Sequence, residues 1–180
     1  MSTELASCEH FLDHSSKGVA LAEKDRYTLS EANLAFAKKI HGEVWVLLEK
    51  TDRSELDDEL MVHAAHASCY HWLHVGRGLN HQRGEWLISR VYAVLNKPGA
   101  ALRHAKRCLD LTSEHDDLIE DFDLAFAYEC VARANAVAVN QEEAIKYIQL
   151  AKEAGDNIKD EGDRRIFFND FNGGEWYGLR

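Results

Sequence analysis

One proline, Pro98, interrupts a chain of 180 residues in which apolar residues recur at helical spacing along almost the whole length. Proline and glycine mark turns, and an all-β chain needs turns roughly every 8–12 residues. With one proline and 11 glycines, the chain has too few turn residues for such a fold. Apolar residues at positions i, i+3, i+4 and i+7 indicate amphipathic helices instead. The sequence therefore predicts an all-α fold.

Capping signals place the boundaries of seven or eight helices. Ser54 begins a capping box, Pro98 fits the first turn of a helix, and Gly76 and Gly155 end helices. Short links make successive helices antiparallel, so we expect a single domain, residues 1–180, built from stacked helix hairpins. The N-terminal segment is 1–27 and the tail is 172–180. The expected helices are 30–50, 54–76, 80–95, 98–112, 118–139, 140–155 and 157–171, with a weaker amphipathic segment at 3–24.

The charge and the cysteines limit the classes of partner. The net charge is −10, and no basic stripe is present to replace the counterions of a nucleic acid, so nucleic acids and anionic membranes are poor partners. No apolar run is long enough to span a membrane. The four cysteines form no CxxC pair, which favours reduced thiols in a cytoplasmic protein. No cofactor motif is present.

Two segments, Gly84–Leu111 and Ala127–Ala154, repeat one pattern of large and small residues. This pattern resembles the tetratricopeptide repeat, most clearly over 80–155, although the usual period of that family is about 34 residues and Asn135 replaces an expected aromatic residue. The stretches AHASCYHWLHVG and GEWLISRVYAVL also resemble those of small uncharacterised bacterial proteins of this type. The resemblance implies a short right-handed superhelical array. The matching pairs are Tyr92 with Asn135, Ala101 with Ala144 and Cys108 with Ala151, at a constant offset of 43.

In tetratricopeptide arrays the first helix of each pair lines a concave groove, and the resemblance assigns six residues of this chain to it. An arginine fork suits a carboxylate, and the aromatic rings suit an apolar side chain. We therefore expect a non-catalytic module that binds a protein or peptide segment, with a carboxylate as a candidate feature of the ligand. In an alternative interpretation, Glu129 pairs with Arg133 along its helix and with Arg90 across helices. The assigned residues are Arg83, Trp86, Arg90, Phe126, Glu129 and Arg133.

Trp45, Trp72 and Tyr92 are expected in the core, and the helix 157–171 is expected to seal the end of the array.

Histidines suggest a different class of function, a metal- or small-molecule-binding protein. Metal binding needs several side chains converging on one ion, and one helix supplies at most two of these imidazoles. A second alternative function is that of a structural homo-oligomer, with a homodimer as the candidate state, that hides the exposed ends of the array. No catalytic motif is present, so an enzyme is not expected. The candidate metal ligands are His10, His14, His63, His66, His71 and His74.

Overall fold

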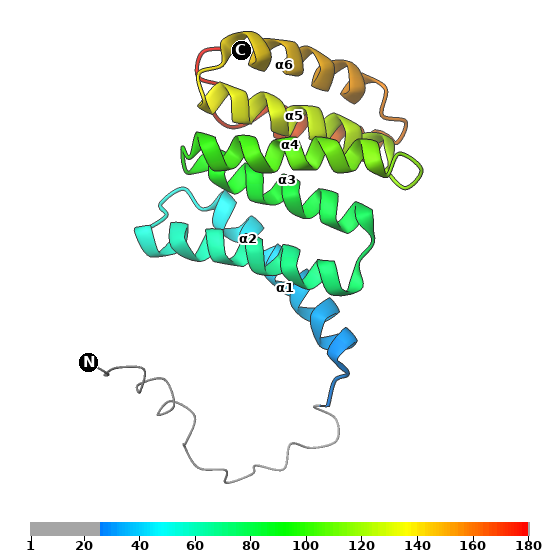
Figure 1. Cartoon of the computed structure of the whole chain (residues 1–180). Coiled ribbons are helices and arrows are strands. Elements are labelled where there is room, and N and C mark those ends of the chain that lie inside the picture. Colours follow the sequence, from blue (N-terminus) through cyan, green and yellow to red (C-terminus); the bar gives the residue numbers. More distant parts are fainter. Residues whose placement is uncertain (1–25, 180) are drawn as a thin grey trace, which may run out of the picture.

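A computed structural model describes residues 26–179, and these residues form seven α-helices and no strand (Figure 1). The predicted all-α fold is confirmed. The expected segment 3–24, with Cys8, His10 and His14, lies outside the described residues. The helices are α1 (Leu29–Glu49), α2 (Glu55–Val75), α3 (Gly78–Val94), α4 (Pro98–Glu114), α5 (Asp121–Val137), α6 (Gln141–Asp156) and α7 (Glu161–Asn172).

Side-chain caps explain where the helices begin. The Ser54 hydroxyl accepts a hydrogen bond from the backbone N–H of Asp57 at the start of α2. The expected start of the last helix at residue 157 is wrong, because Asn157 caps the end of α6 and Asp160 caps α7 by accepting from the N–H of Asp163 at 2.9 Å. Residues 118–120 likewise precede α5.

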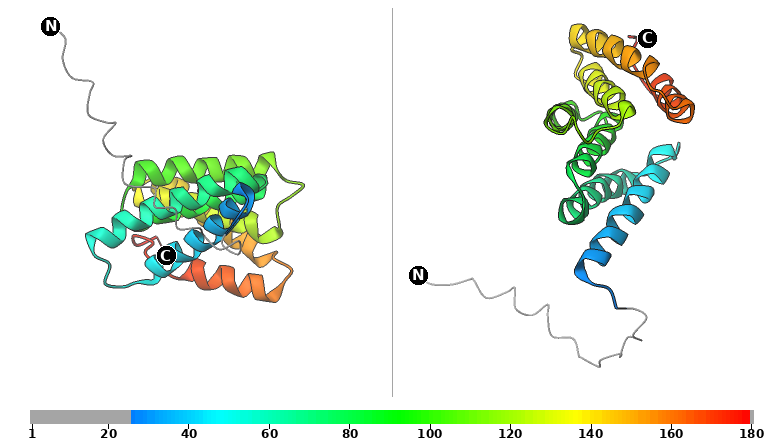
Figure 2. Two further views of the ribbon diagram at one scale, coloured as in Figure 1. Left: turned by 90° about the horizontal axis from the view of Figure 1, so that it is seen from below. Right: turned by 90° about the vertical axis from the view of Figure 1, so that its right-hand side faces the viewer.

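The helices pair as three antiparallel hairpins, α1–α2, α3–α4 and α5–α6, which stack in chain order. Neighbouring hairpins meet through α2 with α3 and α4 with α5, and α3 also contacts α5 directly. Helix α7 turns back onto α5 and α6, on the same side of the stack as α1 (Figure 2). This arrangement leaves α1, α3, α5 and α7 facing a common space.

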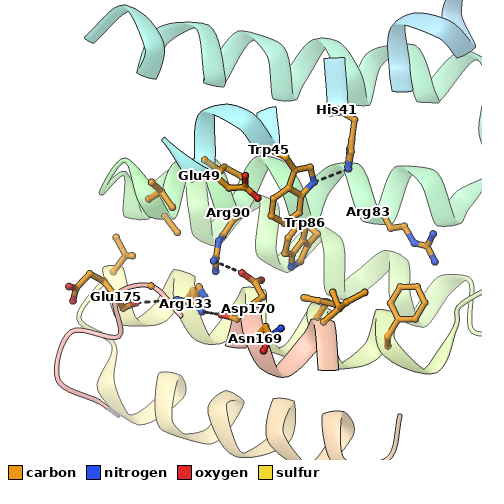
Figure 3. A pocket seen from close by; sticks show the side chains of 18 of the residues that line it. His41, Trp45, Glu49, Arg83, Trp86, Arg90, Arg133, Asn169, Asp170 and Glu175 are labelled. Atoms are coloured by element: carbon orange, nitrogen blue, oxygen red, sulfur yellow. Dashed lines mark hydrogen bonds and ion pairs between the residues drawn. The ribbon is translucent and has the colours of Figure 1, made fainter. Parts of the chain in front are cut away.

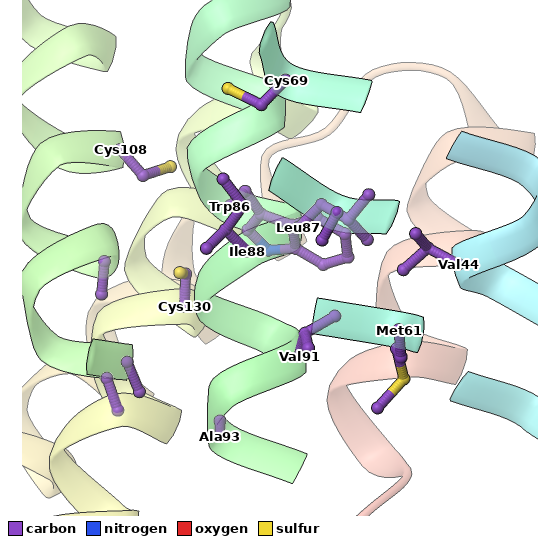
Figure 4. Packing of buried hydrophobic residues seen from close by; sticks show 14 of the residues in the cluster. Val44, Met61, Cys69, Trp86, Leu87, Ile88, Val91, Ala93, Cys108 and Cys130 are labelled. Atoms are coloured by element: carbon purple, nitrogen blue, oxygen red, sulfur yellow. The ribbon is translucent and has the colours of Figure 1, made fainter. Parts of the chain in front are cut away.

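Small residues allow α4 to pack closely on α3 and α6 to pack closely on α5. Ala101 and Cys108 in α4, and Ala144 and Ala151 in α6, are all fully buried. These are the small positions of the internal repeat, so the repeat marks equivalent contacts in two successive hairpins. Figure 4 shows Cys108 beside the packed side chains of α3.

Aromatic residues of α7 complete a second apolar cluster. Phe167 and Phe171 are almost fully buried against α5 and α6, and Trp176 of the tail packs on Phe171. The first and larger apolar cluster is formed by buried residues of α1 to α5, and Trp45 and Tyr92 are partly buried against it. Trp72 is half-buried and belongs to neither cluster. The expectation that Trp72 packs in the core is therefore wrong.

Candidate functional site: a cavity on the inner face

A cavity of about 920 Å³ lies on the face shared by α1, α3, α5 and α7 (Figure 3). Each of these four helices and the C-terminal tail contribute to its wall. The volume falls within the range of pockets that hold small molecules or the side chains of a peptide. Its lining includes His41, Trp45, Glu49, Arg53, Gln82, Val94, Phe122, Val137, Ile166, Asn169, Asp170, Glu175 and Tyr177.

Five of the six groove residues assigned from the sequence line this cavity. Arg83, Trp86 and Arg90 reach it from α3, and Phe126 and Arg133 from α5. Glu129 is the exception, because its side chain is fully buried behind the wall. The assignment of Glu129 to the groove surface is wrong, since its carboxylate faces two arginines between the helices.

Arg90 joins three helices through two ion pairs. Its guanidinium donates from Nη1 to Glu129 Oε1 at 3.0 Å and from Nη2 to Asp170 Oδ1 at 2.7 Å. Only 12% of the Arg90 side chain is exposed. A desolvated charge is retained only when its partners satisfy it. The contacts therefore support the alternative interpretation, in which Arg90 bridges helices.

Arg133 of α5 makes more contacts within the chain than Arg90 does. Its Nε donates to Glu129 Oε1, and its Nη2 donates to the carbonyl oxygens of Asp170 at 2.9 Å and Gly173 at 2.8 Å. The guanidinium also stacks on the ring of Trp176, 4.2 Å from its centroid. Arg133 thus fastens the end of α7 and the tail to α5.

The other two arginines in the wall are also paired. Arg83 donates to both oxygens of Asp123, at 2.8 and 2.9 Å, in the bidentate geometry that favours strong binding. Arg53 donates to Asp58 at 2.8 Å and to the carbonyl of Lys50 at 2.9 Å. All four arginines of the wall therefore have carboxylate partners within the chain.

Aromatic rings form the floor of the cavity. Trp45 of α1 stacks on Trp86 of α3 with ring centroids 5.7 Å apart, and Phe126 of α5 meets Trp86 edge-on at 5.4 Å. Trp45 Nε1 donates to His41 Nε2 at 3.0 Å, which requires that nitrogen to be unprotonated. Burial lowers the pKa of His41 in agreement with this. Figure 3 shows His41, Trp45 and Trp86 side by side.

Several polar atoms of the wall lack a partner among the described residues. Trp86 Nε1, Gln82 Oε1 and Asp170 Oδ2 are buried without a hydrogen bond. Glu49 and Glu175 are exposed at the cavity with no ion pair in residues 26–179. Because the arginines are neutralised, the unpaired charges at the cavity are acidic.

Asp170 has an unusual environment for a carboxylate. Its burial and the charge of Glu129 raise its pKa, and Arg90 and Arg133 oppose that rise. Two guanidiniums and two carboxylates therefore share one poorly hydrated space between α3, α5 and α7.

The histidines chosen from the sequence do not converge on one point. His63 is exposed and lies 4.0 Å from Glu59, and His66 Nε2 lies 3.1 Å from the hydroxyl of Tyr92. His71 Nδ1 lies 2.7 Å from Asn33 Oδ1, and the ring of His74 packs on Tyr70. The four described histidines have four separate surroundings, so they form no metal site together.

Residues of α1, α7 and the tail were missed as parts of the cavity wall. Trp45 carries the same large apolar signal as a core residue, Asn169 lies within the final helix that was expected to seal the array, and Tyr177 follows that helix. The family pattern gave no signal for them, since it describes only the repeated hairpins.

Comparison with known protein families, curated proteins and solved structures gives no match for this chain. In residues 26–179, no helix combines the length and apolar content needed to cross a bilayer.

Proposed function

We propose that this chain is a non-catalytic, tetratricopeptide-like binding module that holds a segment of a protein partner in its inner cavity. The observation that carries the proposal is a preformed cavity of about 920 Å³ with an aromatic floor and a buried, unpartnered donor, Trp86 Nε1. Apolar pockets with a few fixed polar groups are typical of binding sites.

The charges of the wall define the chemistry of the segment. Arg83, Arg90 and Arg133 already bind carboxylates of the chain, so an anionic ligand would have to displace them. Glu49 and Glu175 leave an acidic rim. The favoured segment therefore presents a large apolar side chain flanked by neutral or basic residues, and a carboxylate-bearing peptide is the competing outcome.

The proposal includes a reducing, cytoplasmic setting. The described cysteines, Cys69, Cys108 and Cys130, are buried free thiols, which favours a compartment where thiols stay reduced. The net charge of −10 favours a basic or neutral protein partner over nucleic acid.

The test is selection from a displayed library of random short peptides, followed by affinity measurement by fluorescence anisotropy. Val94→Trp places a ring at the wall of the cavity, on a residue that is already 40% exposed. Val46→Trp is the matched control, because Val46 is an exposed valine of α1 that does not line the cavity.

We expect enriched peptides to carry an aromatic or large aliphatic residue beside basic or neutral ones. Their affinity should fall at least about tenfold in Val94→Trp and stay unchanged in Val46→Trp. Enrichment of acidic peptides would replace the proposed ligand chemistry with carboxylate binding. Failure to enrich any peptide, or equal affinities for both variants, would refute the peptide-binding function.

A further inference from the structure

A second polar cluster lies on the side of α3 that faces away from the cavity. His81 and Glu85 are four residues apart, so they share one helix face, opposite the residues that line the cavity. Cys69 of α2 lies against this face beside Gly84, whose lack of a side chain lets the two helices approach closely. Figure 4 shows Cys69 near the packed residues of α3.

Three potential metal ligands meet at this point. One ligand atom from each of Cys69, His81 and Glu85 lies within 4.8 Å of the other two. His81 Nε2 and Glu85 Oε1 are already 3.2 Å apart. Ligands of a tetrahedral zinc ion are separated by about 3.4–3.6 Å, given bond lengths near 2.0–2.3 Å. Closing the site thus needs the ligand atoms to move by about an ångström at most. A quarter of the His81 side chain is exposed, which leaves this ligand room to move.

A neighbouring histidine holds the carboxylate in place. His104 Nδ1 donates to Glu85 Oε2 at 2.6 Å. Arg103 Nη2 lies 2.9 Å from His104 Nε2, so both ring nitrogens of His104 have a polar neighbour. Carboxylates that bind a metal are commonly hydrogen-bonded by a neighbouring side chain in this way, which fixes the orientation of the carboxylate.

From this geometry we propose that Cys69, His81 and Glu85 bind a divalent transition metal of the zinc class, with water as the fourth ligand. A thiolate, an imidazole and a carboxylate together suit zinc and disfavour calcium or magnesium, which prefer oxygen ligands only. The site is distinct from the cavity, so it is independent of the proposed peptide binding.

Binding exchanges a proton for the metal. Burial and the charge of Glu85 raise the pKa of the Cys69 thiol to about 12, so the metal-free thiol is protonated at neutral pH. Forming the metal–sulfur bond releases this proton to solvent. His81 binds through an unprotonated ring nitrogen and carries its proton on the other nitrogen.

Cobalt and zinc titrations of the metal-free, reduced full chain test the proposal. Co²⁺ reports a coordinated thiolate through a sulfur-to-metal charge-transfer band, and calorimetry gives the zinc affinity. The ligand variants are Cys69→Ala and His81→Gln. Their matched controls are Cys130→Ala, another buried cysteine, and His63→Gln, an exposed histidine outside the cluster.

We expect one equivalent of Co²⁺ with a thiolate band in the wild type and in both controls. Both ligand variants should lose the band and bind zinc at least about a hundredfold more weakly. Should Cys69→Ala fail to fold, His81→Gln decides, because the partly exposed His81 side chain belongs to neither apolar cluster. Absence of the band in the wild type, or an unchanged band and affinity in His81→Gln, would overturn the site; zinc uptake that survives both ligand variants would assign the metal to other histidines.

Discussion

Glu129 is a fully buried carboxylate between two arginines, and its removal would leave both guanidiniums buried without this partner. Arg90 and Arg133 both donate to its Oε1 atom. A buried ion pair gains little over a well-packed apolar pair, but an arginine left without its partner is strongly destabilising. The packing of α3, α5 and α7 therefore requires all members of this ion-pair network to be present together.

We predict that Glu129→Gln lowers the free energy of unfolding by about 3 kcal/mol, because two buried guanidiniums lose their shared negative charge. Urea denaturation followed by circular dichroism measures the change. Glu175→Gln removes a carboxylate exposed at the cavity and should stay within about 0.5 kcal/mol of the wild type. Equal effects of the two substitutions would show that the network contributes no stability.

Sequence spacing revealed only part of this network. Glu129 and Arg133 are four residues apart on one helix, so their pairing was one of the two interpretations weighed. Asp170 joins Arg90 across 80 residues of chain, and no local pattern reports a contact of that kind. The same holds for Cys69 beside His81 and Glu85, because a contact between helices depends on how they stack.

At the scale of single helices, side-chain caps made the boundaries predictable to within a few residues. The start of α2 is fixed by local chemistry, because Ser54 N, Ser54 Oγ and Lys50 Nζ each donate to Asp57 Oδ2 at 2.7 Å. The start of α7 was misplaced because Asn157 and Asp160 are both good N-cap residues. The structure uses Asp160 as the N-cap of α7, because Asn157 still belongs to the end of α6.

We predict that Asp57 makes the stability of α2 depend on pH. Its hydrogen bonds from Lys50 and Ser54 lower the pKa of the Asp57 carboxyl, so its contribution is present above the ordinary value near 3.8 and is lost as the pH falls below it. The difference in free energy of unfolding between wild type and Asp57→Asn should therefore narrow as the pH is lowered from above 3.8 to below it. A difference that stays constant in thermal melts across this range would contradict the prediction.

Two helical glycines should respond oppositely to alanine. Gly42 in α1 is exposed with no described atom near the position of a Cβ, so Gly42→Ala should stabilise the fold by about 0.5–1 kcal/mol. A Cβ on Gly155 in α6 would collide with the ring of Phe167 in α7, so Gly155→Ala should cost about 1–3 kcal/mol. Chemical denaturation of both variants is the measurement, and changes of the same sign would contradict this account of the α6–α7 contact.

On the scale of the whole molecule, the cavity depends on elements from both ends of the described chain. Helix α1 supplies Trp45 and α7 supplies Asp170, on walls that also include α3 and α5. The residues that α3 and α5 contribute to the wall were predicted only through the resemblance to the tetratricopeptide repeat, in which the first helix of each pair lines the groove. The closure by α7 was not, since an amphipathic final helix indicates that it covers apolar surface without indicating which surface.

Arg90 is one of two arginines that bind α7 to the hairpins, and its ion pair with Asp170 gives the last prediction. Arg90→Met removes the ion pair to Asp170 and leaves a carboxylate that burial and Glu129 already disfavour. We expect amide hydrogen exchange in α7 and the tail to become at least about tenfold faster, while α6 is unaffected. Arg107→Met removes an arginine from a solvent-exposed ion pair with Glu114 and should change exchange by less than about twofold. Uniform acceleration along the chain in Arg90→Met would instead mean that α7 and the hairpins unfold as one unit, so that the cavity cannot open without loss of the fold.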